Sequence, residues 1–107
     1  MARRDRSTTP DVQVQQILDV LTEYERVHPR AQIEGRRHNP VSIRLRIIDP
    51  DFQGMGRVER EPEIWQLLRK LPEEVFLNIT MLLLLTPEEA EHSLASQEFD
   101  HPIPSRI

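Results

Sequence analysis

Residues 41–48 read VSIRLRII and give the clearest strand pattern in the chain. Apolar residues alternate there with Ser42, Arg44 and Arg46, which is the period expected of a strand with one buried and one solvated face. We therefore predict that Leu45 faces a core, and that Arg44 and Arg46 project into solvent because a strand cannot bury both sets.

A helical pattern and a shorter strand precede this segment. The helix is predicted over residues 10–27, with Thr9 as its N-cap and Pro10 at its first position. A strand over residues 31–34 follows, and residues 35–40 are predicted to be a polar, turn-rich loop. Two adjacent strands therefore follow one helix.

Downstream of the strand, prolines divide the chain into further elements. Pro62 separates a short helix before Glu61 from a longer helix over residues 62–71, because proline is tolerated only in the first turn of a helix. A third strand is predicted over residues 75–85, and Thr86 caps a final helix. The core face predicted for the third strand consists of Leu77, Ile79, Met81 and Leu83.

Residues 82–85 are four consecutive leucines at the end of that strand. Since side chains alternate between the two faces of a strand, some of these leucines must point away from the helices. Either the last helix covers them, or they form an exposed apolar patch for a partner or a second copy of the chain.

The predicted order is α-β-β-α-α-β-α, an α+β fold with a three-stranded mixed sheet covered on one face by helices. Residues 9–96 are predicted to form a single domain. Residues 1–8 and the C-terminal tail, residues 97–107, are predicted to be flexible.

Composition narrows the chemistry that is available to the 107 residues. The chain has no cysteine, which excludes disulfides, zinc-thiolate sites and thiol catalysis. The most hydrophobic segment, residues 81–85, is too short to span a bilayer, so we expect a cytoplasmic protein without a membrane partner.

Charge is unevenly distributed although the net charge is −4. Residues 29–60 hold seven arginines and four acidic residues, whereas residues 61–107 are strongly acidic. This contrast is compatible with an anionic ligand on one surface, and equally with a solvated surface of mixed charge.

Catalytic motifs are not found in the sequence. The glycines of Gly54-Met55-Gly56 lack the rest of a dinucleotide fingerprint and indicate a turn. The four histidines, His28, His38, His92 and His101, have no metal-ligand spacing. We therefore predict that the protein is not an enzyme and carries no cofactor of its own.

Several short segments nevertheless carry a family pattern. They are the strand over residues 43–48, the segment DFQGMGRVER over residues 51–60, Ile64-Trp65, and TPEEA over residues 86–90. Together these segments resemble the BolA family. The resemblance covers roughly residues 11–92 and implies a fold akin to a type II KH domain. It also implies a binding or regulatory role, in which family members share an iron–sulfur cluster with a monothiol glutaredoxin.

One departure from the family pattern concerns that cluster. Arg60-Glu61 stands where the family carries an Arg-His pair, and a carboxylate suits iron–sulfur iron poorly. His38 lies in the loop where some members place a second ligand, so it is a weak candidate that would act only with a partner. A shared cluster is therefore possible but disfavoured.

Two functional hypotheses remain open. The first is a protein-partner adaptor, with a monothiol glutaredoxin or a second copy of the chain as possible partners, that binds through residues at the third strand and the helix break: Leu82, Leu84, Leu85, Arg60 and Glu61. The alternative is a KH-like nucleic-acid-binding or transcription-regulatory protein that contacts phosphates through its central arginines: Arg36, Arg37, Arg44, Arg46, Arg57 and Arg60.

Overall fold

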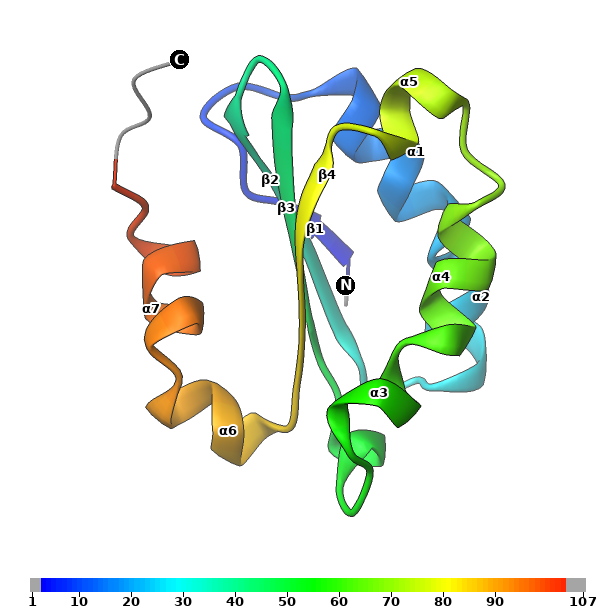
Figure 1. Cartoon of the computed structure of the whole chain (residues 1–107), viewed down its shortest axis with the longest axis vertical. Helices are drawn as coiled ribbons and strands as arrows, with labels where there is room; N and C mark the ends of the chain where they lie inside the picture. Colours follow the sequence, from blue (N-terminus) through cyan, green and yellow to red (C-terminus); the bar gives the residue numbers. More distant parts are fainter. Residues whose placement is uncertain (1–2, 104–107) are drawn as a thin grey trace.

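The computed structural model of the protein describes residues 3–103, and one mixed sheet lies at the centre of this part of the chain (Figure 1). Its strands lie in the order β1 (Arg3–Asp5), β2 (Gln32–Asn39), β3 (Ser42–Ile48) and β4 (Ile79–Leu85). β2 and β3 form an antiparallel hairpin, whereas β1 is parallel to β2 and β4 is parallel to β3. The predicted mixed sheet is confirmed, but the predicted number of three strands is wrong.

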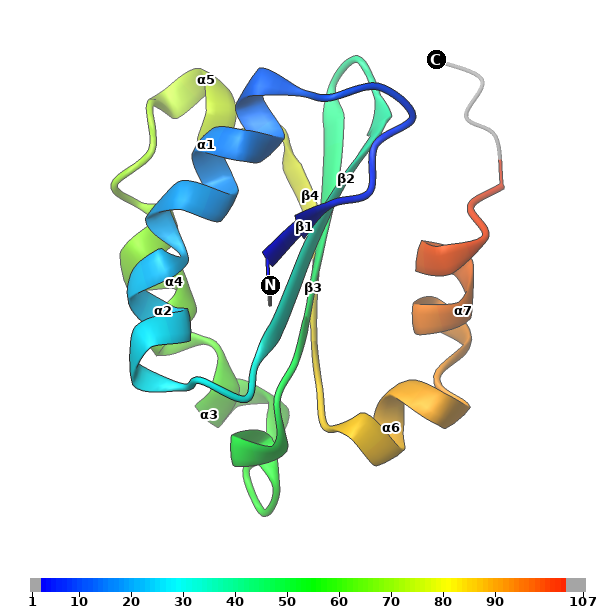
Figure 2. The same ribbon diagram turned by 180° about the vertical axis from the view of Figure 1, so that it is seen from behind.

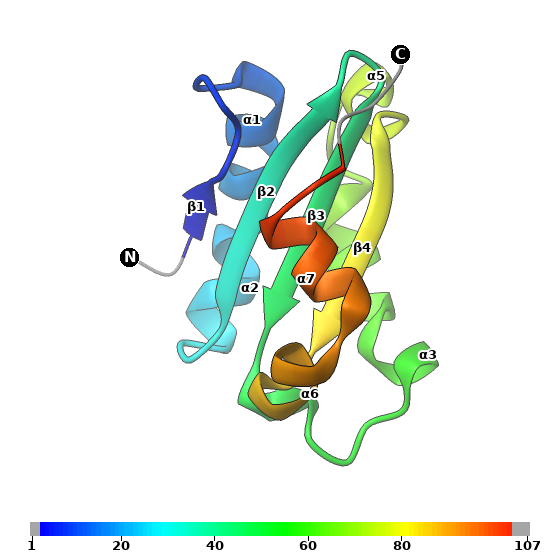
Figure 3. The ribbon, with the colours of Figure 1, turned by 90° about the vertical axis from the view of Figure 1, so that its left-hand side faces the viewer.

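Helices lie on both sides of this sheet (Figures 1 and 2). One face carries α1 (Val12–Val20), α2 (Thr22–Val27), α4 (Pro62–Leu68) and α5 (Glu73–Phe76). A short 3-10 helix (Pro50–Phe52) and α3 (Arg57–Arg60) connect β3 to α4, while α6 (Pro87–His92) leads to α7 (Leu94–Asp100). Figure 3 shows α7 lying over the second face of the sheet. The cover predicted for one face is present, and α7 partly covers the other.

The main core lies between β3 and the first helices. Leu45 is fully buried, as are the neighbouring apolar residues of its face, so the predicted buried face of β3 is confirmed. Close packing of α1 on β2 explains Gly35: a Cβ atom added there would lie 2.9 Å from Cγ1 of Val14 and 3.2 Å from Cδ2 of Leu45. Any larger residue at position 35 would force α1 away from the sheet.

The first helix differs from the predicted one in two respects. Its N-cap is Asp11, whose side chain accepts a hydrogen bond from the backbone N–H of Val14, and not Thr9. The single predicted helix is also divided at Leu21, which ends α1 and begins α2. The cap lies later because Asp5 accepts a hydrogen bond from the Asp11 backbone, which fixes the chain immediately before the helix.

Strand β2 continues through the segment that was predicted to be a loop. Arg36 pairs with Arg44 and Arg37 with Ile43, so the hairpin turns only at residues 40–41. Polar side chains suggested a loop, but they are compatible with a strand here because the second face of the sheet is itself polar. This correction places Arg36 and Arg37 in the sheet.

The ends of the chain are more ordered than expected. Arg3–Asp5, within the segment predicted to be flexible, form β1 alongside β2. Helix α7 continues to Asp100 and so includes the start of the predicted flexible tail. Residues 6–8 and 101–103 form no helix or strand, and residues 1–2 and 104–107 of both predictions lie outside the described residues.

The predicted core face of β4 is confirmed at Ile79, which packs against the core, but Leu77 precedes the strand and is exposed. Beyond Ile79 the prediction is wrong because of an irregularity near the start of the strand. The strand begins at Ile79, since Val75 belongs to α5. Ile43 is opposite Ile79, but the next residue, Arg44, is opposite Met81, which leaves Thr80 as an extra residue. An extra residue exchanges the two faces of the strand beyond it. Consequently Leu82 and Leu84 pack toward the core in place of Met81 and Leu83.

The predicted exposure of Arg44 and Arg46 is also wrong. Both lie on the face opposite the main core, as the alternation requires, but α7 lies over them. Arg46 is only 5% exposed, and Arg44 is half-buried. Carboxylates delivered by α7 neutralise both side chains, so the polar face of β3 is an interior surface.

Candidate partner-binding site at the sheet edge

Strand β4 forms one edge of the sheet, with β3 as its neighbour within residues 3–103. The backbone N–H of Asp49 donates to the carbonyl of Leu85 at 2.9 Å, so the backbone groups of Leu85 face β3. Because these groups alternate along a strand, those of Leu82 and Leu84 face away from β3. Such an edge can accept a further strand by main-chain hydrogen bonding.

Arg60 closes one end of this edge. Its Nη1 donates to the carbonyl oxygen of Leu84 at 2.9 Å, and its Nε donates to the carbonyl oxygen of Met55 at 3.1 Å. The guanidinium is buried and also pairs with Glu89. Arg60 therefore ties α3 to β4 and α6, and leaves the edge around Leu82 for a partner.

The pairing also fixes the start of α6. Hydrogen bonds from Arg60 and from the backbone of Thr86 lower the pKa of Glu89 to about 2. Glu89 thus remains ionised at neutral pH and completes a capping box with Thr86. The predicted N-cap at Thr86 is confirmed.

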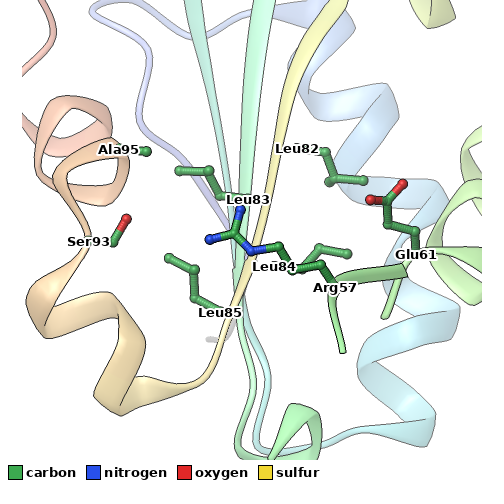
Figure 4. Close-up of a pocket in the computed structure, with 8 residues that line it drawn as sticks. All are labelled: Arg57, Glu61, Leu82, Leu83, Leu84, Leu85, Ser93 and Ala95. Atoms are coloured by element: carbon green, nitrogen blue, oxygen red, sulfur yellow. The ribbon is translucent and has the colours of Figure 1, made fainter. Parts of the chain in front are cut away.

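A pocket of about 120 Å³ opens along the β4 edge (Figure 4). Leu82, Leu84 and Glu61 line it on the side of the main helices, and Leu83 and Leu85 on the side of α7. The remaining lining residues are Arg57, Ser93 and Ala95. This volume is below the roughly 300 Å³ of a typical small-molecule cleft. We call these eight residues the edge pocket; its size suits a protein side chain.

Most of the residues predicted to bind a partner meet in this region. Leu82, Leu84, Leu85 and Glu61 line the edge pocket, and Arg60 binds the carbonyl of Leu84. Leu84 and Leu85 are buried, and Leu82 and Leu83 are half-buried, so none of the four leucines is fully exposed, and binding of a partner there stays a prediction. The contributions of Leu83, Ser93, Ala95 and Arg57 were not predicted. The predicted helix after Thr86 was the one indication that residues beyond β4 pack back against this strand.

Glu61 is held by its own helix. The indole Nε1 of Trp65 donates to Oε1 of Glu61 at 2.9 Å, one turn further along α4. The carboxylate is exposed at the rim of the edge pocket. It can accept a hydrogen bond or a cation from a partner, which is the chemistry expected of a rim residue.

The six arginines of the nucleic-acid hypothesis do not form one surface. Arg44 and Arg46 lie under α7, whereas Arg57 and Arg60 lie at the β4 edge. Four of the six have carboxylate partners: Arg37 with Asp11, Arg44 with Glu98, Arg46 with Glu34 and Asp100, and Arg60 with Glu89. These pairs neutralise charge that phosphate contacts would need.

Arg36 is half-buried and packs beside an aromatic ring. Its guanidinium carbon lies 5.7 Å from the centre of the Phe99 ring, and its Nε atom is buried without a hydrogen-bond partner in the described part of the chain. Burial is the main reason why the pKa of Arg36 is lowered. Arg57 alone is exposed and lies across the β4 edge.

His38 lies far from Glu61. It belongs to β2, next to the hairpin turn, and that turn is at the opposite end of the sheet from α3 (Figure 1). Its neighbours in a shallow hollow include Arg37 and Asp11. The structure therefore does not bring His38 and Glu61 together as a ligand pair.

Another cluster was not predicted from the sequence. His28, Asp49 and Asp51 converge where α2 and β3 both end, and each contributes an atom within 4.8 Å of the others. Spacing along the chain could not reveal it, because His28 and Asp49 come from different elements. The sequence indicated only that His28 and Asp49 each follow the end of a predicted helix or strand.

Comparison of the chain with protein-family models, curated proteins and solved structures finds no match. Within residues 3–103, none of the helices has the length and apolar character required to span a membrane.

Proposed function

We propose that the protein is a non-enzymatic binding module that takes an extended segment of a partner protein along the β4 edge. The free edge supplies main-chain hydrogen bonds, and the edge pocket receives a partner side chain. This is the usual division between affinity and specificity when a strand is added to a sheet. BolA-like ancestry belongs to the same proposal and is supported by the helix and strand order that follows β1.

The edge pocket is the observation that carries this proposal. Four leucines of one edge strand surround it, and Arg57 and Glu61 supply opposite charges at its rim. An apolar centre with a charged rim is the arrangement found in protein interfaces. The pairing of arginines with carboxylates on the second face gives the nucleic-acid alternative no comparable site.

Capture experiments with matched variants test the proposal. Tagged wild-type protein is incubated with cell extract, with and without nuclease treatment, alongside Leu83→Lys and Leu77→Lys. Leu83 lines the edge pocket, whereas Leu77 is exposed before β4 begins. Both substitutions place one lysine on an exposed or half-exposed leucine, so they differ mainly in location.

We expect wild type and Leu77→Lys to retain the same protein and Leu83→Lys to lose it, with far-ultraviolet circular dichroism unchanged in all three. Recovery by Leu83→Lys equal to that of wild type would contradict the proposal. Recovery that disappears after nuclease treatment would favour nucleic-acid binding instead.

Sharing of an iron–sulfur cluster is not part of the proposed function. Glu61 offers a carboxylate, one oxygen of which, Oε1, already accepts a hydrogen bond from Trp65. We expect no mixed complex when the protein is reconstituted with a monothiol glutaredoxin and a two-iron cluster, because such clusters take thiolate or imidazole ligands. Visible circular dichroism measures this, and a spectrum that differs from that of the glutaredoxin alone would refute it.

A further inference from the structure

A compact group of polar side chains lies where α2, β3 and α4 meet. His28 ends α2, Asp49 follows β3, Asp51 lies in the 3-10 helix, and Glu63 is in the first turn of α4. The Nδ1 atom of His28 is 2.8 Å from Oδ2 of Asp51 and 3.7 Å from Oδ2 of Asp49. Its Nε2 atom is 3.0 Å from Oε2 of Glu63.

Asp49 is fully buried in this cluster. Its Oδ2 accepts a hydrogen bond from the Tyr24 hydroxyl at 2.6 Å, and its Oδ1 accepts one from the backbone N–H of Asp51. These two donors are neutral, and the imidazole of His28, with Nδ1 3.7 Å from Oδ2, is the group that faces this carboxylate and can carry a positive charge. A buried charge requires a cation nearby.

Negative charge is in excess around His28. Asp49, Asp51 and Glu63 all approach the imidazole, and the opposing guanidinium is that of Arg30, which contacts Asp51 at 2.6 Å and is largely exposed. Three carboxylates thus face one guanidinium and one imidazole. The cluster attracts a further positive charge.

We propose that Nδ1 of His28 and one carboxylate oxygen each from Asp49 and Asp51 bind a single divalent transition-metal ion, for which Zn²⁺ is the probe. Two ligands at about 2.0–2.2 Å from the same ion lie roughly 3–4 Å apart. The separation of 3.7 Å lies within this range, and that of 2.8 Å lies just below it. Small side-chain adjustments therefore admit the ion.

The surroundings orient these ligands as a metal site requires. Glu63 binds the far nitrogen of the imidazole, which fixes the ring and raises the basicity of Nδ1. Tyr24 stacks on the same ring with centroids 4.2 Å apart and also holds Asp49. Tyr24 therefore orients both the imidazole and the Asp49 carboxylate, and Glu63 orients the imidazole.

Ligand chemistry selects the class of ion. Imidazole with two carboxylates suits Zn²⁺ and other first-row divalent ions, whereas Mg²⁺ and Ca²⁺ prefer oxygen ligands alone. Asp51 is partly exposed, so a fourth position faces solvent. A proton on Nδ1 of His28 competes with the ion for the same position. The alternative is therefore a protonated His28 that pairs with the carboxylates without any metal, and the experiment must distinguish the two.

Isothermal titration calorimetry of chelator-treated full-length protein with Zn²⁺ provides the test, together with the unfolding temperature measured with Zn²⁺ and with EDTA. We expect one equivalent to bind and to raise the unfolding temperature. Asp51→Asn and His28→Asn should each weaken binding at least tenfold, and Glu63→Gln by about tenfold. His92→Asn removes an exposed histidine outside the cluster and should bind like wild type.

Two results would overturn the proposal: no stoichiometric binding to wild type, or binding that survives unchanged in Asp51→Asn. If His28→Asn does not fold, Asp51→Asn still decides, because its side chain is partly exposed. Nitrogen-15 spectra of the imidazoles add a direct readout. They should show a Zn²⁺-dependent shift at Nδ1 of His28, and equal shifts at all four histidines would also overturn the assignment.

Discussion

The two faces of the sheet are held by different kinds of contact. On the first face, Leu45 and its apolar neighbours on β3 belong to one cluster of buried apolar side chains with those of α1. On the second face, Arg44 and Arg46 meet Glu98 and Asp100 of α7 through ion pairs of 2.5–2.8 Å. The difference shows that one strand can bury both of its faces when carboxylates cover the second.

Phe99 is the apolar anchor within the polar face. Its ring is fully buried, and the guanidinium carbon of Arg46 lies 4.6 Å from the ring centre. The stem and the planar head of an arginine can pack on an aromatic ring while its N–H groups bond outward. Helix α7 therefore docks through one aromatic ring surrounded by charge.

A charge placed in the first face should have the largest effect. Leu45→Asp buries a carboxylate with no cation and should destabilise the fold by more than about 4 kcal/mol. Val41→Asp, at an exposed position beside the same strand, should change stability by less than about 0.5 kcal/mol. Denaturant unfolding followed by circular dichroism measures both. Similar losses would mean that the first face is not the principal core.

Removing one partner from the second face should have a smaller effect. Arg46→Met removes one of the two guanidinium groups that pair with Glu34 and Asp100, since Arg6 also contacts both. Breaking such a buried pair costs about 3 kcal/mol. The cost should fall in the double variant Arg46→Met/Glu34→Gln, because the stranded charge is then removed as well. Chemical denaturation provides the free energies, and full additivity of the two changes would show that the pair is not coupled.

The half-buried pair nearby should contribute less. Arg44→Ala, Glu98→Ala and the double variant form a cycle from which we expect a coupling of about 1 kcal/mol that weakens in 1 M salt. A solvated Arg44, as predicted from the sequence, would instead have a negligible effect on stability. A coupling near zero at low salt would restore the interpretation that Arg44 is solvated.

Low pH should weaken the second face before the first, and this is the smallest of the expected effects. Hydrogen bonding to Arg46 lowers the pKa of Asp100 in the folded protein below its ordinary value of 3.8. Its stabilising contribution is therefore complete above about pH 4 and is lost as the pH falls through the lowered value. Hydrogen exchange should show α7 opening before β3 in acid. Asp100→Asn should reduce this difference, and simultaneous opening would contradict it.

Sequence pattern predicted the first face and not the second for a physical reason. Alternation places Leu45 and Arg44 on opposite sides of β3, but it contains no information on what faces the arginines. Their partners lie more than fifty residues away in α7. A short helix with one buried aromatic residue has a weak apolar periodicity, so its docking on the sheet could not be predicted.

Local irregularities account for most of the other differences. The extra residue Thr80 reverses the side-chain alternation of β4, and such a displacement leaves no trace in a run of four leucines. Strand β1 is three residues long and highly charged, so strand propensity gives no signal there. The structure brings the leucines and Glu61 to one pocket, and their role in binding a partner stays a prediction.

The ion pair between Arg6 and Asp100, at 3.4 Å, joins the first and last parts of the described chain. During synthesis the second face of the sheet must therefore wait for its cover until residue 100 has left the ribosome. An uncovered apolar face would invite aggregation during that interval. Arginine side chains can remain hydrated until α7 has been synthesised. The polar character of this face therefore allows α7 to dock late without an aggregation-prone intermediate.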